Sequence, residues 1–373
     1  MKYMGSKRSM LLNGLGDLLA GATTETTRFV DLFAGSGAVA IHVATKYDVS
    51  VIASDLQQYS AVLAGAVLER QSELDCKRVW LDWYDRARKV RRRQRPPKLE
   101  RVTKKSVQEF RDWCSHRSSL PLTKAYGGHF FSPVQALWLD ALRTTVPQKK
   151  PARTVALAAL LHVASRCAAS PGHTAQPLQP GRKANGYIAE AWIKDVPTLT
   201  KESLEALSVL FAKRIGITNT SDANAAADTL QETDLVFLDP PYSAVQYSRF
   251  YHVLESVATG SAGEVSGSGR NPVPEMRPQS QYSIIKGADK ALSELLNKIA
   301  RKGARCIVTF PAHRCSNGLS GERVRALAHQ YFNVAEKLVQ SRFSTLGGAD
   351  VEVGNGRAPR HVAEEMILTL SPK

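Results

Sequence analysis

The feature that most constrains this chain is an apolar run that ends abruptly in the stretch "LVFLDPPY", Leu235–Tyr242. Its leading apolar residues predict a buried strand. Asp239 stands where that strand would leave the sheet, and Pro240 and Pro241 cannot continue its ladder of hydrogen bonds. Because two prolines fix the backbone and remove two N–H donors, carbonyl oxygens and a carboxylate are left directed at one place. With the flat face of Tyr242 beside them, these acceptors suit a planar ring that carries an NH2 group.

Other apolar runs recur along the chain, with helical patterns between them. Strands that alternate with helices indicate an α/β fold with a largely parallel sheet. Residues 56–215 are predicted to be mostly helical, and residues 258–280, which are rich in Gly, Ser and Pro, are expected to form a mobile loop. The further strands are expected in "TRFVD" (27–31), 49–55, "GITNTSDA" (216–223), 304–310 and 364–370.

A glycine-rich turn follows the first of these strands in "FVDLFAGSGAVA". Gly35 and Gly37 let the backbone approach a ligand without a Cβ in the way. Asp55 ends the next strand, where α/β folds place an acid against ribose hydroxyls. Ala40 completes the spacing of a dinucleotide fingerprint, so a dinucleotide remains an alternative at this turn. Asp31 favours a different ligand, because a carboxylate suits a cation such as a sulfonium or an ammonium better than a pyrophosphate.

The charge of the chain is strongly basic and unevenly distributed. The formal net charge is +16 with a pI near 9.7, which favours a polyanionic partner over a merely solvated basic surface. Eleven of the twenty residues in Arg86–Lys105 are Lys or Arg, and we call this segment the basic window. It is predicted to follow a phosphate backbone, since Trp80, Trp83 and Tyr84 lie alongside; the alternative is a disordered, solubilising loop.

Several classes of protein are excluded by the same composition. No apolar stretch approaches the roughly 18 residues of a membrane span. The start of the chain, "MKYMGSKRSM", lacks the apolar region of a signal peptide, so a cytoplasmic protein is expected. The five cysteines are scattered and form no CxxC pair, which argues against a disulfide framework and against a structural zinc site.

Taken together, five motifs resemble the D12 class of adenine-specific DNA methyltransferases, the Dam-like family. Their order along the chain also matches that family. The resemblance implies the Rossmann-like sheet of methyltransferases that use S-adenosylmethionine. It also implies a catalytic domain of residues 1–55 and 216–373 and a largely helical insertion, residues 56–215, for target recognition. The motifs are "KYMGSKR" (Lys2–Arg8), "DLFAGSG" (Asp31–Gly37), Asp55, "SDA" (Ser221–Ala223) and "DPPY" (Asp239–Tyr242).

The resemblance also implies roles for single residues. Asp239 and the carbonyl of Pro240 would each accept one N–H of the N6 amine of adenine, which turns its lone pair toward the methyl group. Transfer is then a direct displacement, without metal or covalent enzyme intermediate, and Tyr242 stacks on an adenine that has left the duplex. The implied catalytic residues are Asp239, Pro240, Pro241 and Tyr242. The implied residues for S-adenosylmethionine are Lys2, Tyr3, Gly5, Asp31, Phe33, Gly35, Gly37, Asp55 and Asp222, although Asp222 by itself resembles a plain turn acid.

Contacts to duplex DNA are expected at a third group of residues: Lys7, Arg8, Arg91, Arg92, Arg93, Arg95, Tyr247 and Arg249. In "FPAHRCSNGLSG", His313, Arg314 and Asn317 are further candidates, but Asn317 or Ser320 is rather expected to cap a helix. Companion restriction or defence proteins are expected partners, and a membrane is not. Two alternatives remain: an RNA adenine N6-methyltransferase, and a non-catalytic nucleic-acid-binding protein on the same scaffold.

Overall fold

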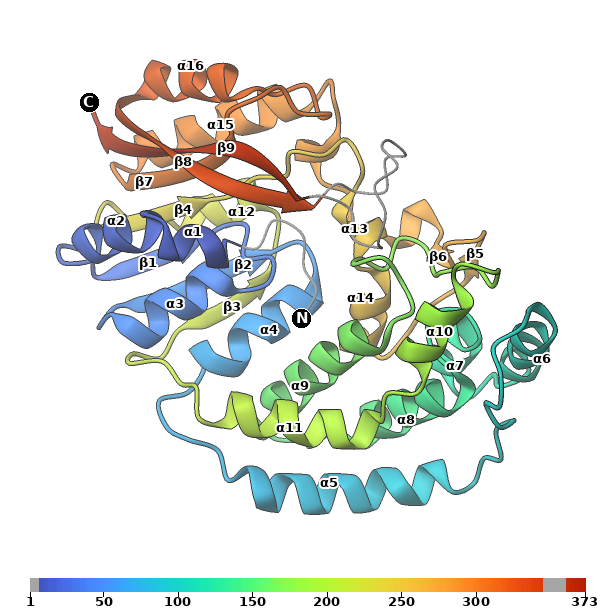
Figure 1. Cartoon of the computed structure of the whole chain (residues 1–373). Helices are drawn as coiled ribbons and strands as arrows, with labels where there is room; N and C mark the ends of the chain where they lie inside the picture. Colours follow the sequence, from blue (N-terminus) through green and yellow to red (C-terminus); the bar gives the residue numbers. More distant parts are fainter. Residues whose placement is uncertain (1–6, 345–359) are drawn as a thin grey trace. The chain divides into compact units, whose positions relative to one another are not determined.

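The computed structural model describes residues 7–344 and 360–373, and the chain divides into two compact units (Figure 1). The sheet unit comprises the described residues up to Leu56, together with Lys213–Tyr247 and Gln279–Lys373. The helical unit comprises Gln57–Ala212 and Ser248–Pro278. None of the helices formed by residues 7–344 and 360–373 is long and apolar enough to cross a membrane.

The sheet unit contains one seven-stranded sheet in the order β3-β2-β1-β4-β7-β9-β8. Strands β3, β2, β1, β4 and β7 run parallel, whereas β9 is antiparallel to both β7 and β8. The predicted α/β fold with a largely parallel sheet is therefore confirmed. The strands are β1 (Arg28–Asp31), β2 (Ser50–Asp55), β3 (Ile217–Thr220), β4 (Asp234–Leu238), β7 (Arg305–Pro311), β8 (Phe332–Ser344) and β9 (Arg360–Pro372).

Strand pairing brings three strand ends to one edge of this sheet. Asp31, the last residue of β1, lies opposite Ala53 of β2 and Phe237 of β4. The acids that end or follow these strands, Asp31, Asp55 and Asp239, therefore gather at the carboxyl edge, where open parallel sheets bind ligands.

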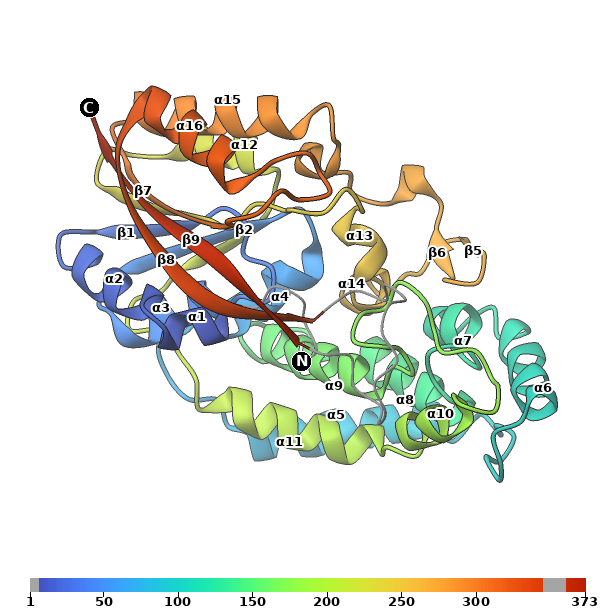
Figure 2. The same cartoon turned by 45° about the horizontal axis from the view of Figure 1, so that its top comes forward.

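Helices cover both faces of the sheet (Figures 1 and 2). One face carries α1 (Arg8–Leu12), α2 (Leu15–Ala22) and α3 (Ala38–Lys46), and the other carries α12 (Ala223–Ala226), α15 (Ala288–Arg301) and α16 (Gly321–Tyr331). The buried residues of α15 recur at helical spacing, so a single apolar stripe packs on the sheet. Its leucines join Val30, Val236, Val308 and Leu368 of four strands in one core cluster.

The helical unit is built around two helices that are apolar on almost every side. Most residues of α4 (Gln58–Leu68) and α9 (Ala152–Cys167) are buried, which is typical of helices at the centre of a bundle. The prediction of a mostly helical segment is confirmed. The surrounding helices are α5 (Cys76–Arg91), α6 (Lys104–Ser115), α7 (Pro121–Tyr126), α8 (Pro133–Thr144), α10 (Asn185–Trp192), α11 (Val196–Ser208) and α14 (His252–Thr259).

The segment 258–280 differs from the expected mobile loop. Val265–Ser266 (β5) pairs with Asn271–Pro272 (β6) in a short antiparallel hairpin. The side chain of Arg270 ties this hairpin to the carbonyl of Ala125 in α7 at 2.9 Å. Glycine is used here for tight turns, since Gly267 has a φ of 67°, and the composition alone does not reveal such packing.

The aromatic residues beside the basic window, which favoured its prediction as a segment that follows a phosphate backbone, pack against one another and against α8. Trp83 is fully buried and its indole N–H donates to the carbonyl of Leu142 at 2.9 Å. Trp80 stacks on Tyr84, which in turn stacks on Trp138 of α8, with ring centroids 5.2 and 5.8 Å apart. These rings join α5 to α8 and leave no free platform for bases.

Candidate active site

The carboxylate of Asp239 lies just beyond β4 and is held by its neighbours on one oxygen. The hydroxyl of Thr309, on the adjacent strand β7, donates to Asp239 Oδ1 at 3.0 Å. The ammonium of Lys7 lies 3.1 Å from the same oxygen. Among the described residues no donor reaches the second oxygen, Oδ2, so one side of this carboxylate remains open to a ligand.

Lys7 links Asp239 to a second acid. Its Nζ donates to Glu365 Oε2 at 2.8 Å, and Glu365 comes from the antiparallel strand β9. Lys7 and Glu365 have exposed side-chain fractions of only 4% and 3%. The row Asp239–Lys7–Glu365 is therefore a buried network of two carboxylates and one ammonium.

This network controls the protonation of its members. Burial alone would lower the pKa of Lys7, but the carboxylates of Asp239 and Glu365 outweigh it and raise that pKa above its ordinary value. Burial also raises the pKa of Asp239; Lys7 opposes the rise and Glu365 adds to it. Lys7 thus remains a cation and favours the ionised form of Asp239.

The backbone after Asp239 is fixed by a fully buried amide. Asn317 Nδ2 donates to the carbonyls of Pro241 and Tyr282 at 2.8 and 3.0 Å, and its Oδ1 accepts from the N–H of Leu319 at 3.2 Å. Because all of these contacts lie inside the protein, Asn317 does not fit the DNA contact considered from sequence. Ser320 takes the capping role instead: its hydroxyl accepts from the N–H of Arg323 at the start of α16.

Tyr242 presents a partly buried ring beside the carboxylate. Tyr247 lies edge-on to it, with ring centroids 6.5 Å apart and planes at 85°. The two side chains also share a hydrogen bond, and burial raises the pKa of Tyr242. Tyr247 is therefore a neighbour that orients Tyr242, besides its expected role near DNA.

The glycine turn between β1 and α3 is organised by two acids. Gly35 and Gly37 have φ angles of 51° and 73°, the left-handed region that favours glycine. The N–H of Gly35 donates to Asp55 Oδ2 at 2.8 Å, which ties the turn to the end of β2. Asp31 Oδ1 accepts from the N–H of Phe33 at 3.2 Å.

Asp31 is a buried acid whose pKa is shifted strongly upward. It is 1% exposed, and burial raises its pKa to about 8. The nearby carboxylates of Asp239 and Asp55 raise it further, while the backbone hydrogen bond from Phe33 lowers it. Lys7 is ion-paired with Asp239 and Glu365, and the carboxylate of Asp31 adds further negative charge beside this network, so the site is suited to a positively charged ligand.

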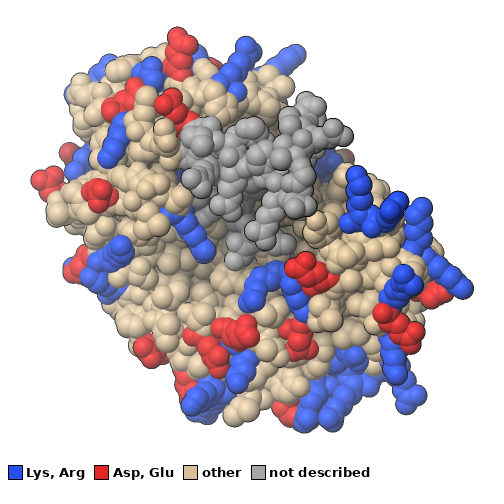
Figure 3. Space-filling model, in the orientation of Figure 1, with Lys and Arg blue, Asp and Glu red and all other residues tan. Residues whose placement is uncertain are grey.

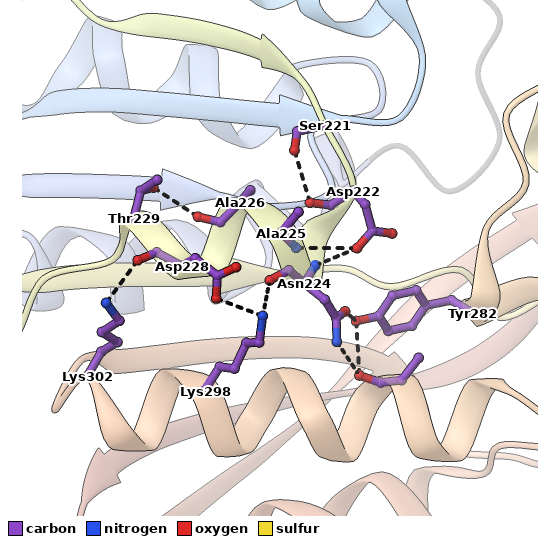
Figure 4. Close-up of polar contacts among 11 residues, drawn as sticks. Ser221, Asp222, Asn224, Ala225, Ala226, Asp228, Thr229, Tyr282, Lys298 and Lys302 are labelled. Atoms are coloured by element: carbon purple, nitrogen blue, oxygen red, sulfur yellow. Dashed lines mark hydrogen bonds and ion pairs between the residues drawn. The ribbon is translucent and has the colours of Figure 1, made fainter.

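Asp222 follows β3 and caps α12 (Figure 4). Its Oδ1 accepts from the N–H groups of Asn224 and Ala225 at 2.8 and 3.4 Å. Its second oxygen forms no hydrogen bond among the residues drawn in Figure 4. Oδ1 of Asp222 therefore acts as an ordinary helix cap, as the sequence suggested, whereas the second oxygen is available to a ligand.

The short helix α12 is attached to α15 by polar contacts (Figure 4). Lys298 of α15 donates to the carbonyl of Asn224 at 2.8 Å and to Asp228 at 2.7 Å. Lys302 donates to the carbonyl of Asp228 at 2.8 Å. The hydroxyl of Tyr282 donates to the side-chain oxygen of Asn224. These bonds fix the position of Asp222 at the edge of the sheet.

The other predicted residues differ in whether the structure describes them and in whether their side chains are exposed. Lys2, Tyr3 and Gly5 lie outside the described residues. The burial of Lys7 does not fit its expected contact with DNA, whereas Arg8 is exposed at the start of α1. Arg249 is exposed at the end of α13 (Tyr247–Phe250). The basic window belongs to the helical unit and is treated below.

Three residues of the site were not predicted from the sequence in their present roles: Thr309, Asn317 and Glu365. Thr309 and Asn317 are polar residues in or after an apolar strand, a pattern too common to single out. Glu365 stands inside "EEMILTL", where one of two neighbouring acids must face the interior. An acid inside an apolar strand is unusual, and this feature of the sequence could have indicated that Glu365 belongs to a site.

The sequence matches the family of D12 class N6 adenine-specific DNA methyltransferases over residues 3–92 and 195–295, just over half of the chain. The matched segments contain the glycine turn, Asp55, Asp222 and the "DPPY" motif. The chain belongs to this family.

Curated relatives agree with this assignment. The chain is 23% identical over 300 residues to the modification methylase LlaI of Lactococcus lactis subsp. lactis and 24% identical over 309 residues to the type II methyltransferase M.FokI of Planomicrobium okeanokoites. The alignments cover 76% and 80% of this chain but 42% and 43% of those two relatives, so it spans less than half their length. It is also 28% identical over 274 residues to the type II methyltransferase M.NlaIII of Neisseria lactamica, covering 69% of each.

Proposed function

We propose that this protein is a site-specific DNA methyltransferase that transfers a methyl group from S-adenosylmethionine to the N6 amine of adenine in duplex DNA. The observation that carries the proposal is the carboxylate of Asp239. It is fixed through Oδ1 by Thr309 and Lys7, and Oδ2 remains open at the carboxyl edge of the sheet. Membership of the D12 family supports the same reaction.

The residues around the glycine turn fit the proposed methyl donor. S-adenosylmethionine, when bound, supplies an electrophilic methyl group on a positively charged sulfur. Asp31, Asp55 and Asp239 concentrate negative charge where this cation and the ammonium of the donor would be held. Burial raises the pKa of Asp31 to about 8, and a bound cation would favour its ionised form. Asp55 and Asp222 would hold the ribose hydroxyls and the amine of the donor's own adenine.

The "DPPY" segment is proposed to hold the acceptor amine. Asp239 Oδ2 and the carbonyl of Pro240 each accept one N–H of the target amine, so the nitrogen lone pair is freed from the ring and faces the methyl group. Asn317 keeps the proline segment from moving because it binds the carbonyl of Pro241. Tyr242 stacks on the adenine, which must leave the duplex to reach this pocket.

The helical unit would supply target recognition. It contains the basic window, and its cations give it the electrostatic character of a surface that follows a phosphate backbone. We further propose that companion restriction or defence proteins act with this enzyme, by analogy with relatives named modification methylase and type II methyltransferase.

A transfer assay with tritiated methyl donor tests the proposal. Wild-type protein should label duplex DNA, with the label recovered as N6-methyladenine. Asp239→Ala should cut turnover by at least ~10²-fold, the order found when one preorganised hydrogen-bonding group is removed. Donor and DNA binding should stay within about tenfold, because the missing hydrogen bond acts mainly in the transition state. Asp17→Ala, which removes an exposed acid of α2, is the matched control and should keep full activity.

The same assay separates the alternatives. Label on RNA but not on duplex DNA would assign the enzyme to RNA. Tight DNA binding without label on either substrate would indicate a non-catalytic binding protein. Near-normal methylation by Asp239→Ala would contradict the mechanism given to this carboxylate.

A further inference from the structure

Two arginines of the helical unit lie close enough for their charges to interact, although they are far apart in the sequence. Arg111 lies in α6, and its Nε donates to the carbonyl of Gly128 at 3.0 Å while Nη2 donates to Gln179 Oε1 at 3.2 Å. Arg270 lies in the β5–β6 hairpin, and its Nε donates to the carbonyl of Ala125 at 2.9 Å. Both side chains are partly buried rather than extended into solvent.

The backbone around these arginines is constrained to bring them together. Arg270 has a φ of 52°, and no other non-glycine residue of the described ranges 7–344 and 360–373 has a positive φ. A Cβ at Gly269 would lie 2.5 Å from the carbonyl oxygen of Ala175, and a Cβ at Gly128 would lie 2.7 Å from the backbone nitrogen of Arg111. Close packing therefore fixes both segments, and a left-handed arginine is kept despite its cost.

The electrostatics of the pair are unfavourable in the protein alone. Burial lowers the pKa of Arg111, and the charge of Arg270 lowers it further. Burial and both arginines lower the pKa of His129 to about 3, so this neighbouring imidazole is neutral. No ion pair joins Arg111 or Arg270 to a carboxylate within residues 7–344 and 360–373. Two like charges held close in this way are expected where an anion completes the site.

Arg70 of the same unit shows how an arginine with a purely structural role uses its donors. Arg70 is 5% exposed and directs its guanidinium to the carbonyls of five residues in the same unit. Arg111 and Arg270 use only part of their donors within the described chain. Nη1 of Arg111 and both Nη groups of Arg270 donate to no protein acceptor among the described residues. An arginine has five N–H donors in a planar fork that matches a phosphate.

The surroundings add positive charge rather than cancel it. Arg249 lies close enough to Arg277 to lower its pKa, although burial is the larger cause and Glu275 acts in the opposite sense. Figure 3 shows Lys and Arg side chains gathered on the face that carries α6 and α10. The anion that this region would attract is therefore part of a larger polyanion.

We propose that Arg111 and Arg270 form a phosphate-binding site that takes one phosphodiester group of the DNA backbone and positions the duplex on the helical unit. The proposal rests on the proposed function, because it deepens how that substrate is held. It differs from the basic window, which ends in the first turn of α6 and was predicted from its charge and from the aromatic residues beside it. No sequence pattern indicates this site, because its two arginines come from segments 159 residues apart.

Binding of duplex DNA measured by fluorescence anisotropy at several salt concentrations tests this site. Arg270→Asn is the first variant, since Asn accepts a left-handed backbone, and Arg111→Gln is the second. Each should reduce the slope of log affinity against log salt by about 0.9, the value for one phosphate contact. Because both arginines hold the same phosphate, the double variant should lose about the same amount rather than twice as much. Arg78→Gln, which removes an exposed charge of α5, is the control for net charge.

The outcomes separate this site from the proposed function. The loss should be equal on cognate and random duplexes, because a phosphate contact positions the protein without reading the sequence. An unchanged slope in folded variants, or a loss confined to cognate DNA, would overturn the phosphate assignment. The proposed function would still stand in that case, provided that the wild-type protein methylates DNA. Failure of the wild-type protein to methylate DNA would instead reject the proposed function. Thermal unfolding of each variant verifies that a loss of binding is not a loss of fold.

Discussion

At the scale of single residues, the chemistry depends on the charge of Asp239, which two neighbours affect in opposite directions. Lys7 lies 3.1 Å from its Oδ1 and favours the ionised form, whereas Glu365 disfavours it. Only an ionised carboxylate can accept hydrogen bonds on both oxygens. The activity should therefore fall as the pH drops through the pKa of Asp239, which burial holds above the ordinary value.

This arrangement predicts opposite shifts for two variants. Lys7→Met removes the cation, so the pKa of Asp239 should rise and the acidic limb of the pH profile should move up by roughly 1–3 pH units. Glu365→Gln removes the competing anion, so the same limb should move to lower pH. The measurement is single-turnover methyl transfer across pH at saturating donor, where the bound cation keeps Asp31 ionised.

The pH profile distinguishes a tuning role from a merely structural one. If both variants lose activity equally at every pH and the acidic limb stays in place, Lys7 and Glu365 only support the fold. Gln330→Glu, which adds an exposed charge near the end of α16, is a suitable control and should leave the profile unchanged.

At the scale of elements, Arg70 joins the ends of two helices. It follows α4, and its Nε donates to the carbonyl of Ala66 in that helix at 2.9 Å. Its Nη1 and Nη2 donate to the carbonyls of Ser208 and Leu207, the last residues of α11, at 3.0 and 2.6 Å. The final carbonyls of a helix have no partner within it, and their partial negative charge suits a cation.

Removing this arginine should destabilise the helical unit more than any ordinary surface change. Arg70→Met leaves several buried carbonyls without donors and should cost about 3 kcal/mol, or a drop of roughly 6–12 °C in Tm. The stability of Arg70→Lys should lie between those of the wild type and Arg70→Met, because an ammonium cannot reach all of these carbonyls. Calorimetry measures the effect, and Arg78→Met on the exposed surface should shift Tm by less than about 2 °C. Equal melting of Arg70→Met and wild type would contradict the capping role.

The same scale explains which elements the sequence predicts and which it does not. The apolar runs before Asp31, Asp55 and Asp239 indicate strands because each is buried between two neighbours. Strand β8 lies at the edge of the sheet, and exposed polar residues such as Lys337 and Gln340 interrupt its apolar pattern. The glycine turn and "DPPY" carry the site in their local sequence. The network of Lys7, Asp239 and Glu365 joins distant segments, so no local pattern reveals it.

At the scale of the whole molecule, much of the excess positive charge is concentrated in the helical unit, but the structure divides the basic window into two parts. Arg86, Arg88 and Lys89 lie on α5 and form ion pairs with Asp82 and Asp85. Beyond α5 the exposed cations are Arg92, Arg93, Arg95, Lys98, Arg101, Lys104 and Lys105. Arg91 belongs to neither part, since burial lowers its pKa and its Nη1 donates to the carbonyl of Gln94 at 3.0 Å.

Only the second part should contribute to DNA binding. Changing Arg92, Arg93 and Arg95 together to Gln should reduce the salt slope of affinity by up to about 2.7, or 0.9 for each phosphate that is no longer neutralised. The reduction should be the same for cognate and random duplexes, because phosphate contacts position a protein without reading its target. Changing Arg86, Arg88 and Lys89 to Gln removes the same formal charge, but these residues are already paired with acids, so the slope should change far less. Equal slopes for the two triple variants would show that net charge alone governs binding. An unchanged slope for the variant of Arg92, Arg93 and Arg95 would show that the basic window is only a solvated surface.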